Sequence, residues 1–398
     1  MVINTPVTVA VAIIALWIGF HINRRVAFLH TYHIPPAISG GLLISTLVAV
    51  IEATSGIEIR FDLQLRDLLL ITFFSTIGLS ARLRQMLEGG KALAIMLGLA
   101  IVLLLFQNLT GTAIALLAGE SPLYGLVGGS VSLAGGHGTA ITWGQLFEEH
   151  FGLANASSIG MTFATAGLIA GGLIGGPVGA WLIRRNNLYS GADKLELQHI
   201  ETKHKITYII ELNSVLTAVL LIALCFALGA TVYGWLSDFG MRLPAFLTAM
   251  FLGILLTNSL ELFKVDIDHR PIQMVGDLSL QLFLGMSLIS LPLLSLQGAL
   301  GLISLVMVMQ IILISLITIY VVFPILGRDY DAACISSGFI GMGLGATPIG
   351  IANMNALTSR FGPSPKAYLV IPLLGAFFID IANASLVQLL LSMDMFSN

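Results

Sequence analysis

Charged residues are scarce in this sequence. Only 10% of its 398 residues are Asp, Glu, Lys or Arg, whereas an ordinary soluble domain carries about 25%. Hydrophobic residues make up 57% of the chain and occur in long uninterrupted runs. Because so few charges could not cover a water-exposed surface, the composition excludes an ordinary soluble protein and predicts a protein with several membrane spans.

Several other signals are missing. The formal net charge is −3, so no basic excess indicates a nucleic-acid partner. The two cysteines, Cys225 and Cys334, both lie in apolar stretches, and we interpret them as buried hydrophobic residues, not as a disulfide or a metal pair. The chain also contains no H-E-x-x-H and no G-x-S-x-G sequence. We therefore predict that it is not an enzyme.

Uncharged windows predict where the chain crosses the membrane. Windows without Asp, Glu, Lys or Arg cover 92–119, 121–147, 151–183, 212–237, 243–260, 278–327 and 332–359, and further apolar stretches lie at about 6–23, 34–51, 62–81 and 367–393. A helix needs about 20 residues to cross the bilayer core. Since window 278–327 is long enough for two helices, the sequence contains twelve candidate membrane segments.

Two of these segments contain glycine runs that a continuous helix would not tolerate well. The first carries Gly-Gly-His-Gly-Thr at 135–139, and the second carries a glycine run that ends in Pro348. Non-helical backbone at membrane depth survives only where protein or a water-filled cavity satisfies it. We therefore predict re-entrant hairpins at about 124–148 and 332–359, which leaves ten true spans.

Landmarks in the first half of the chain recur in the second half, in the same order. The offset stays between 206 and 210 residues for Pro36 and Pro244, Asp67 and Asp277, Tyr124 and Tyr330, Thr139 and Thr347, and Phe151 and Phe361. This pattern indicates duplication. We predict an all-α polytopic membrane protein with a first repeat at 1–185, a cytoplasmic linker at 186–206 and a second repeat at 207–398. Because each repeat has five spans, an odd number, the second is inverted relative to the first.

The distribution of basic residues predicts the orientation in the membrane. With the N-terminus outside, 15 of the 18 Lys and Arg residues fall on inner loops, as the positive-inside rule requires. The exceptions are Arg60, Arg66 and Arg242. Ten spans then return the C-terminus to the outer side as well.

The predicted hairpin tips are the candidate site for an anionic solute. No Lys or Arg lies deep in a predicted span, so backbone N–H groups at helix N-termini would have to supply the positive partners. His137 could position the hairpin, contact substrate or sense protons, and the glycines could instead serve only tight packing. The candidate substrate-binding residues are Gly135, Gly136, His137, Gly138, Thr139, Gly343, Gly345, Ala346, Thr347 and Pro348.

Asp380 is the most informative single residue. It has 13 uncharged residues on either side, and a carboxylate at mid-bilayer depth is costly unless it is paired or binds a cation. It could bind Na⁺ or a substrate ammonium, or pair with a nearby helix end or hydroxyl. Because hard cations prefer oxygen ligands, the candidate sodium-binding residues are Asp380, Asn383, Ser132 and Asn353. Gln107, Asn108 and Gln310 are buried amides that either line the site or join helices.

Motifs along nearly the whole chain match one known family. They include Leu-Arg-Asp at 65–67, Phe-Phe-Ser-Thr-Ile-Gly-Leu at 73–79, Gly-Gly-His-Gly-Thr at 135–139, Gly-Leu-Gly-Ala-Thr-Pro at 343–348 and Gly-Ala-Phe-Phe-Ile-Asp at 375–380. With these motifs the chain resembles the bacterial sodium/glutamate symporters, the glutamate:Na⁺ symporter family, and is similar in plan to the hydroxycarboxylate transporters.

The resemblance implies a function and an assembly. It implies Na⁺-driven import of L-glutamate, and we expect this to occur across the bacterial inner membrane. It also implies a homodimer in which a transport domain moves against a scaffold domain, an elevator-type alternating-access mechanism. The alternatives are a Na⁺- or H⁺-coupled transporter of another small carboxylate or amino acid, and a membrane-embedded enzyme.

Overall fold

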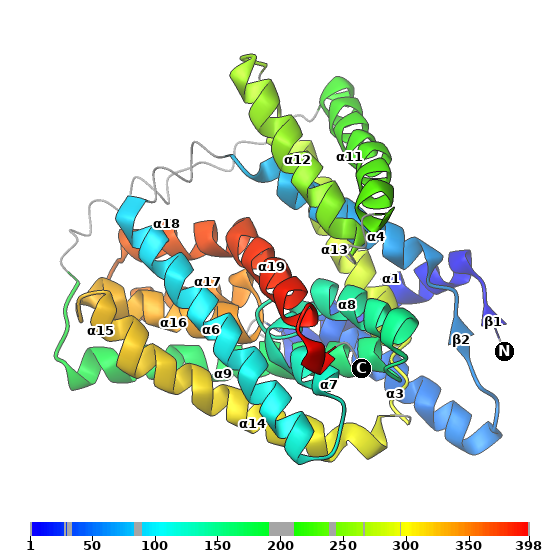
Figure 1. Ribbon diagram of the computed structural model, residues 1–398, viewed down its shortest axis with the longest axis horizontal. Helices are drawn as coiled ribbons and strands as arrows, with labels where there is room; N and C mark the ends of the chain where they lie inside the picture. The colour runs from blue at the N-terminus through cyan, green and yellow to red at the C-terminus, as the bar shows by residue number, and fades with distance from the viewer. Residues whose placement is uncertain are drawn as a thin grey trace. The chain divides into compact units, whose positions relative to one another are not determined.

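The chain is helical, as the sequence predicts (Figure 1). The computed structural model describes residues 2–27, 29, 34–82, 90–190, 211–238, 244–265, 267–294 and 296–396. Most of the predicted linker at 186–206, and Arg242, lie outside these described residues. Apart from the helices there are two short strands, β1 (Val2–Ile3) and β2 (Arg60–Phe61), which pair in parallel.

Eight helices among the described residues are long and apolar enough to cross a membrane. They are α1 (Thr5–Arg25), α3 (Pro36–Ser55), α6 (Gly90–Leu117), α9 (Ala156–Arg185), α11 (Leu212–Asp238), α12 (Ala245–Leu262), α13 (His269–Ile289) and α14 (Leu300–Ile317), which continues through η3 (Thr318–Val322) and α15 (Phe323–Ile325). The predicted pair of spans within 278–327 corresponds to α13 and α14.

The other two predicted spans are shorter or interrupted. The stretch at 62–81 forms α4 (Gln64–Ser80), which has 17 residues. The stretch at 367–393 forms α18 (Pro365–Leu373), the π-helical η4 (Leu374–Phe378) and α19 (Ile379–Leu391) in succession. Pro372 lies in the last turn of α18, two residues before η4 begins, and proline interrupts the regular α-helical hydrogen-bond ladder. The last predicted span is therefore helical throughout, with a change of helix type before Asp380.

Local sequence determines where several helices begin and end. The side chains of Asn4 and Asp329 accept hydrogen bonds from the backbone N–H groups of Val7 and Ala332, which caps the N-termini of α1 and α16 (Tyr330–Leu344). Gly152 ends α8 (Gly136–Phe151) with a φ of 64°, a left-handed conformation that glycine adopts without strain.

The chain forms two compact units, and each draws on both halves of the sequence. Unit 1 contains 1–84 and 209–298, and unit 2 contains 85–208 and 299–398. Neither unit coincides with a predicted repeat. The two segments of unit 1 start 208 residues apart (209 − 1), within the offset that the sequence landmarks show. The division into compact units does not test the predicted repeats, which therefore remain a prediction.

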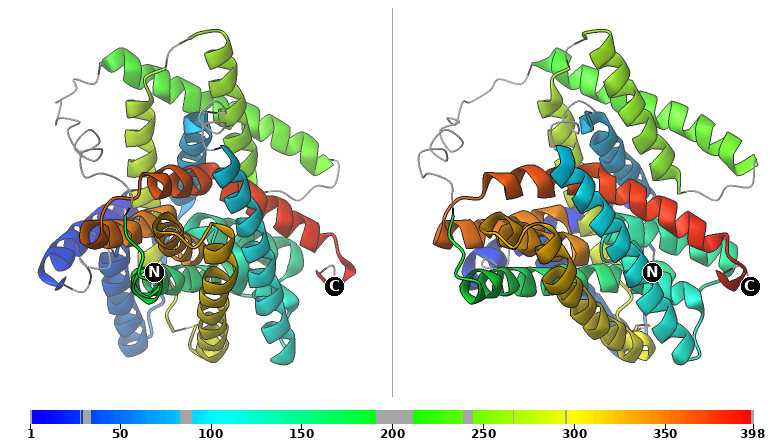
Figure 2. Two further views of the ribbon diagram at one scale, coloured as in Figure 1. Left: turned by 90° about the vertical axis from the view of Figure 1, so that its left-hand side faces the viewer. Right: turned by 60° about the vertical axis from the view of Figure 1, so that its left-hand side comes forward.

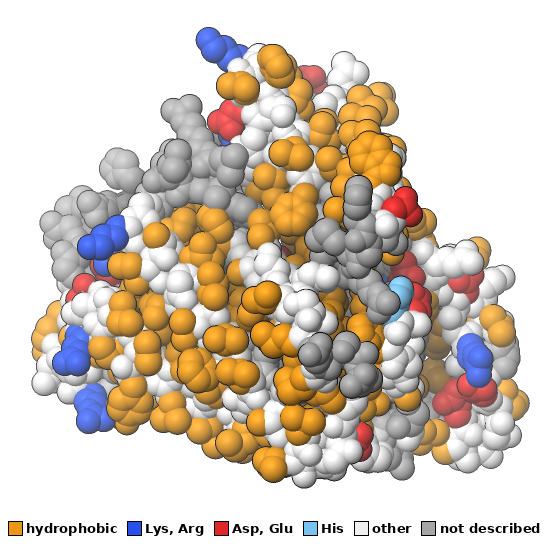
Figure 3. Space-filling model, viewed as in Figure 1, with side chains coloured by type: hydrophobic (Ala, Val, Ile, Leu, Met, Phe, Trp, Pro, Cys, Tyr) orange, Lys and Arg blue, Asp and Glu red, His pale blue; other side chains and the backbone are white. Residues whose placement is uncertain are grey.

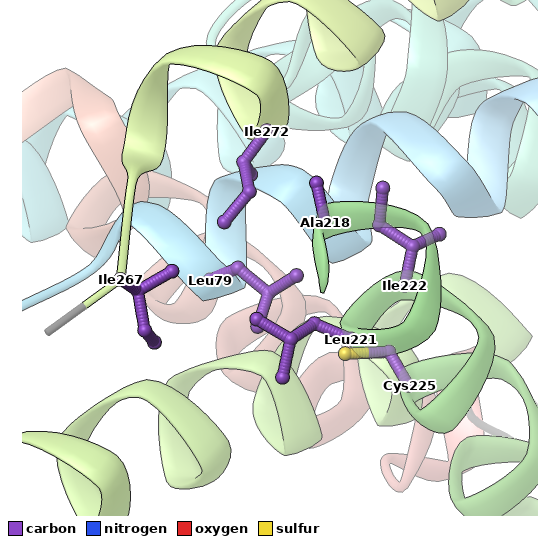
Figure 4. Close-up of a cluster of buried hydrophobic side chains, with 7 residues drawn as sticks. All are labelled: Leu79, Ala218, Leu221, Ile222, Cys225, Ile267 and Ile272. Atoms are coloured by element: carbon purple, nitrogen blue, oxygen red, sulfur yellow. The ribbon is translucent and has the colours of Figure 1, made fainter. Parts of the chain in front are cut away.

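Unit 1 is held together by close helix contacts. Helix α1 packs on α3, and α4 packs on α12 and α13. A Cβ on Gly19 would overlap the carbonyl oxygen of Pro36, and a Cβ on Gly78 would overlap that of Met250. Small residues at such crossings let backbones approach closely, as is common between membrane helices. A cluster of buried hydrophobic side chains from α4, α11 and the start of α13, including Leu79 and Cys225, fills the interior nearby (Figure 4).

Unit 2 contains both glycine-rich segments. Helix α16 packs against α9, α18 and α17 (Thr347–Phe361), and α8 also packs on α9. Two further views show the course of these helices (Figure 2). Over α6 and α14 the visible surface is largely hydrophobic (Figure 3), because side chains such as Phe106 and Leu305 are 45% and 53% exposed. An apolar outer surface around buried amide side chains is the opposite of the arrangement in a soluble domain. Such a surface suits contact with lipid.

Candidate functional site

The first glycine-rich segment is a broken helix. Helix α7 (Pro122–Leu126) runs into the π-helical η1 (Val127–Val131), where Gly129 has non-helical φ and ψ of −97° and −136°. The chain then turns through residues 132–135 before α8 begins at Gly136. We call residues 132–135 the first helix break. Gly136 has a φ of 74°, so the turn requires a residue that tolerates the left-handed region.

The second glycine-rich segment is also a broken helix. Helix α16 ends at Leu344, Gly345 and Ala346 are extended or irregular, and α17 begins at Thr347. We call residues 345–346 the second helix break. Pro348 lies in the first turn of α17, where its missing N–H has no intrahelical partner to lose. A Cβ on Gly136 would lie 3.4 Å from the carbonyl oxygen of Gly345, so the two helix breaks are neighbours.

Two helix N-termini therefore lie at adjacent breaks. Neither α8 nor α17 has a side-chain cap on its first backbone N–H groups, and the first N–H groups of a helix have no intrahelical acceptor. Each N-terminus also carries a partial positive charge of about half an elementary charge. The arrangement can bind anionic oxygens without a Lys or Arg side chain.

The two predicted threonines have different surroundings. The Thr139 hydroxyl lies 2.6 Å from the Val131 carbonyl oxygen and 3.1 Å from that of Gly136, so it closes the first break from within. The Thr347 hydroxyl lies directly against Gly375, where a Cβ would overlap it. Thr139 is therefore a structural element of the break, whereas Thr347 marks where η4 approaches the start of α17.

His137 is oriented by one hydrogen bond. Its Nε2 lies 3.1 Å from the hydroxyl of Thr165, which donates its own proton to the carbonyl oxygen of Met161 at 2.9 Å. With that proton on the Met161 carbonyl, His137 Nε2 is the donor. In the neutral ring, Nδ1 then carries the lone pair and is an acceptor. The structure thus gives His137 a positioning contact, one of the three predicted roles, and leaves Nδ1 as the atom that could contact a substrate.

A hydroxyl and two amides form a buried cluster beside the first break. Ser130 Oγ lies 3.0 Å from Asn108 Oδ1 and 2.5 Å from Asn383 Oδ1. The Ser130 N–H donates to Asn108 Oδ1, and Asn383 Nδ2 donates to the Ser130 carbonyl, so both amide orientations are determined. The single hydroxyl proton can serve only one of the two amide oxygens. The cluster is therefore rich in oxygen lone pairs, and all three residues are at most 1% exposed.

Two glutamines connect the spans to the segments that contain the breaks. Gln107 Nε2 donates to the Gly343 carbonyl at 2.8 Å. Gln310 Nε2 donates to the carbonyls of Gln107 and Gly128 at 2.8 Å and 3.2 Å. The side-chain oxygens of both glutamines are buried and have no hydrogen-bond partner among the described residues. Both predicted lining residues thus join helices in unit 2.

Asp380 lies one helical turn from Asn383 on the buried face of α19, as the sequence predicts. It is 9% exposed, and the described residues offer it no hydrogen bond or ion pair. Helix α19 packs on α6 and η1, the elements that carry Asn108 and Ser130. A buried carboxylate beside neutral oxygens can bind a hard monovalent cation.

The remaining predicted sodium ligands are dispersed. Ser132 lies in the first break, with a buried hydroxyl that has no partner among the described residues. Asn353 donates to the Gly171 carbonyl at 2.9 Å and packs against Gly175, so it joins α17 to α9. Ser130 was not among the predicted ligands, although its Gly-Gly-Ser sequence at 128–130 was a usable signal. The structure thus groups Asn383 with Ser130 and Asn108, and Asp380 lies one turn from Asn383 on the same buried face of α19. Asn353 contacts Gly171 instead.

A helical chain with eight candidate spans and a buried polar site at paired helix breaks belongs to the class of multi-pass membrane proteins. The sodium/glutamate symporter family model matches residues 1–363. The chain is 39% identical over 397 residues to the sodium/glutamate symporter of Escherichia coli (strain K12), which covers 99% of each chain. It is 35% identical over 393 residues to that of Haemophilus influenzae, which covers 97% of this chain and 96% of the relative. The chain belongs to the sodium/glutamate symporter family, and its matched relatives are named as symporters, not as enzymes.

Proposed function

We propose that this protein is a symporter that uses the Na⁺ gradient to import L-glutamate across the bacterial inner membrane. The observation that carries the proposal is the family match over nearly the full chain, joined to two uncapped helix N-termini at adjacent breaks. An amino-acid dicarboxylate needs donors for its carboxylates and an acceptor for its ammonium. The candidate donors are the N–H groups of His137 and Gly138 in α8 and of Thr347 in α17, because those of Gly136, Ile349 and Gly350 already donate to backbone carbonyls. The candidate acceptors are His137 Nδ1 and Asp380.

Na⁺ is proposed to bind the Asp380 carboxylate together with the oxygens of Asn108, Ser130 and Asn383. The competition of two amide oxygens for one hydroxyl proton supports this choice, because a cation could bind to both oxygens. Na⁺ would also offset the cost of a buried carboxylate. Since Ser130 lies in η1 and Asn383 on α19, one ion would join the segment before the first break to the last helix of the chain and so prepare the site for substrate.

The finer architecture is part of the proposal. We propose that α7–α8 and α16–α17 are re-entrant hairpins of two inverted repeats, and that unit 2 moves against unit 1 in an elevator-type cycle within a homodimer. Support comes from the location of both helix breaks in unit 2 and from the way each unit combines corresponding segments of the two halves. Gln107 and Gln310, which each hold a backbone carbonyl of a broken segment, would let both segments move together.

Uptake into proteoliposomes tests the function directly. The purified protein should accumulate labelled L-glutamate when an inward Na⁺ gradient is imposed, and dissipation of that gradient should abolish accumulation. An inward proton gradient without Na⁺ is the matched control, and accumulation driven by that gradient alone would contradict Na⁺ coupling.

A counterflow panel addresses the second candidate function, transport of another small carboxylate or amino acid. Vesicles preloaded with glutamate should exchange labelled glutamate faster than labelled aspartate, citrate or malate. If one of these solutes exchanged faster than glutamate while Na⁺ dependence persisted, the substrate assignment would be wrong and the coupling assignment would stand.

A further inference from the structure

A small charged cavity lies in unit 1, away from the helix breaks. It has a volume of about 200 Å³ and is lined by residues near the ends of α4 and α12 and at the start of α13. The polar residues of its lining are Arg82, Thr257, Glu261, Lys264 and His269. Thr257 donates to the Leu79 carbonyl at 2.7 Å, so its proton is used within the wall. The charges left in the cavity are two cations and one carboxylate.

The two cations have no carboxylate partner among the described residues. The ion pairs found there are Arg60–Glu58, Arg66–Asp67 and Arg270–Asp268. Arg82 instead donates from Nε to His269 Nε2 at 3.2 Å. This contact needs the lone pair of Nε2, so the ring accepts there and directs the guanidinium. Because a guanidinium has further N–H donors, Arg82 retains donors for an anionic ligand.

The charges around the cavity are of both signs. Glu261 lies in the last turn of α12, and Lys264 is held just beyond the same helix by its N–H bond to the Glu261 carbonyl and by a left-handed φ of 58°. Arg82 follows the end of α4, and His269 begins α13. The carboxylate favours an ammonium and the two cations favour an anion, and a ligand that carries both charges is a zwitterion.

The cavity also lies at a membrane boundary. Helices α12 and α13 are both candidate spans, so the turn that joins them lies where lipid headgroups are found. Ile267, on the cavity wall, belongs to the buried hydrophobic cluster that contains Leu79 (Figure 4). On α12, Leu255 and Leu262 are 62% and 80% exposed. A ligand that fits this setting has a zwitterionic head and apolar chains.

We propose that this cavity binds the headgroup of a zwitterionic phospholipid with a primary ammonium, that is, phosphatidylethanolamine. Its phosphodiester contacts Arg82 and Lys264, and its ammonium donates to Glu261. Phosphatidylcholine offers the same phosphate but no N–H donor, and phosphatidylglycerol offers the phosphate without the ammonium. This site does not depend on the proposed transport function.

Lipid binding to the purified full-length protein in detergent tests the proposal. Native mass spectrometry with equimolar mixtures of lipids with matched chains should show a preference for phosphatidylethanolamine over phosphatidylcholine of about threefold to tenfold, the effect of one charge-assisted hydrogen bond. Glu261→Gln should remove this preference. Lys264→Asn, which keeps a residue that tolerates the left-handed conformation, should weaken binding of all three lipids.

Controls separate the cavity from general surface charge. Arg270→Gln removes a nearby cation that does not line the cavity, and it should leave the lipid preference unchanged. Glycerophosphoethanolamine, which has the headgroup without acyl chains, should compete weakly. Equal binding of the ethanolamine and choline lipids by the unmodified protein would overturn the proposal, whether or not the variants fold. So would full competition by the soluble headgroup, or a loss in Arg270→Gln as large as that in Lys264→Asn.

Discussion

At the scale of single residues, Ser130 shows how a hydroxyl can organise a buried polar site. It joins Asn108 and Asn383, which are 275 residues apart (383 − 108), within one set of contacts. Buried polar groups inside a membrane protein are costly unless satisfied, and here two amide oxygens compete for one hydroxyl proton. A cation could bind to both oxygens, which makes Ser130 a sharper test than the residues of the glycine runs.

We expect Ser130→Ala to raise the Na⁺ concentration for half-maximal glutamate uptake by about tenfold, because the variant loses one ligand and its hydrogen bonds. Uptake at saturating Na⁺ should be retained. The Na⁺ dependence of initial uptake rates in proteoliposomes measures both quantities. Ser315→Ala is the control, since among the described residues the Ser315 hydroxyl bonds only to the carbonyl of Ile311 in its own helix. Equal Na⁺ dependence in the two variants would exclude Ser130 as a ligand.

Asp380→Asn should weaken the Na⁺ dependence or abolish uptake. The substitution keeps the size of the side chain but removes the negative charge, and a neutral amide no longer compensates a bound cation. Because the variant also removes a buried charge, its thermal midpoint should not fall, which separates a transport defect from misfolding. Glu120→Gln, an exposed carboxylate in the loop after α6, is the control. Unchanged Na⁺-driven uptake in Asp380→Asn would remove this residue from the site.

At the scale of elements, adjacent glycines in α9 have different roles. A Cβ on Gly175 would overlap the amide of Asn353 and approach the Ser337 carbonyl to 2.8 Å, whereas a Cβ on Gly176 meets nothing within 4 Å. Helix α17, which carries Asn353, can therefore approach α9 this closely only because residue 175 is a glycine. Of the two adjacent glycines, Gly175 is required by the packing of the second broken helix, and Gly176 is not.

Gly175→Ala should lower the free energy of unfolding by about 1–3 kcal/mol, the usual cost of overpacking. Gly176→Ala should raise it by up to about 1 kcal/mol, because alanine has the higher helix propensity. Thermal unfolding of the two variants in detergent compares them directly. Equal midpoints would show that α17 does not approach α9 as closely as the structure describes.

At the scale of the whole molecule, the distribution of charge predicts how the chain lies in the membrane. The proposed orientation places both termini outside, and 15 of 18 basic residues inside. A phosphatase fused to the C-terminus should therefore be active in intact cells. A fluorescent protein fused at the same point would be exported by the same route and should not fluoresce. A phosphatase fused within 186–206 is the control and should be inactive. The opposite pattern would reverse the orientation.

Local sequence patterns were enough to predict the class of protein, the approximate spans, the two helix breaks and the family. These features follow from hydropathy and from the backbone preferences of glycine and proline, which act over a few neighbouring residues. The burial of Asp380 beside Asn383 was predictable for the same reason, since three residues along a helix share a face.

Which buried polar groups contact each other became clear only from the packing of the helices. Asn353 and Asn383 are alike in sequence context, yet one bonds to the Gly171 carbonyl and the other to Ser130. The same packing makes each compact unit combine both halves of the chain. Such pairings depend on how distant helices pack, and no local propensity carries that information, because a side chain's partner can lie 253 residues away.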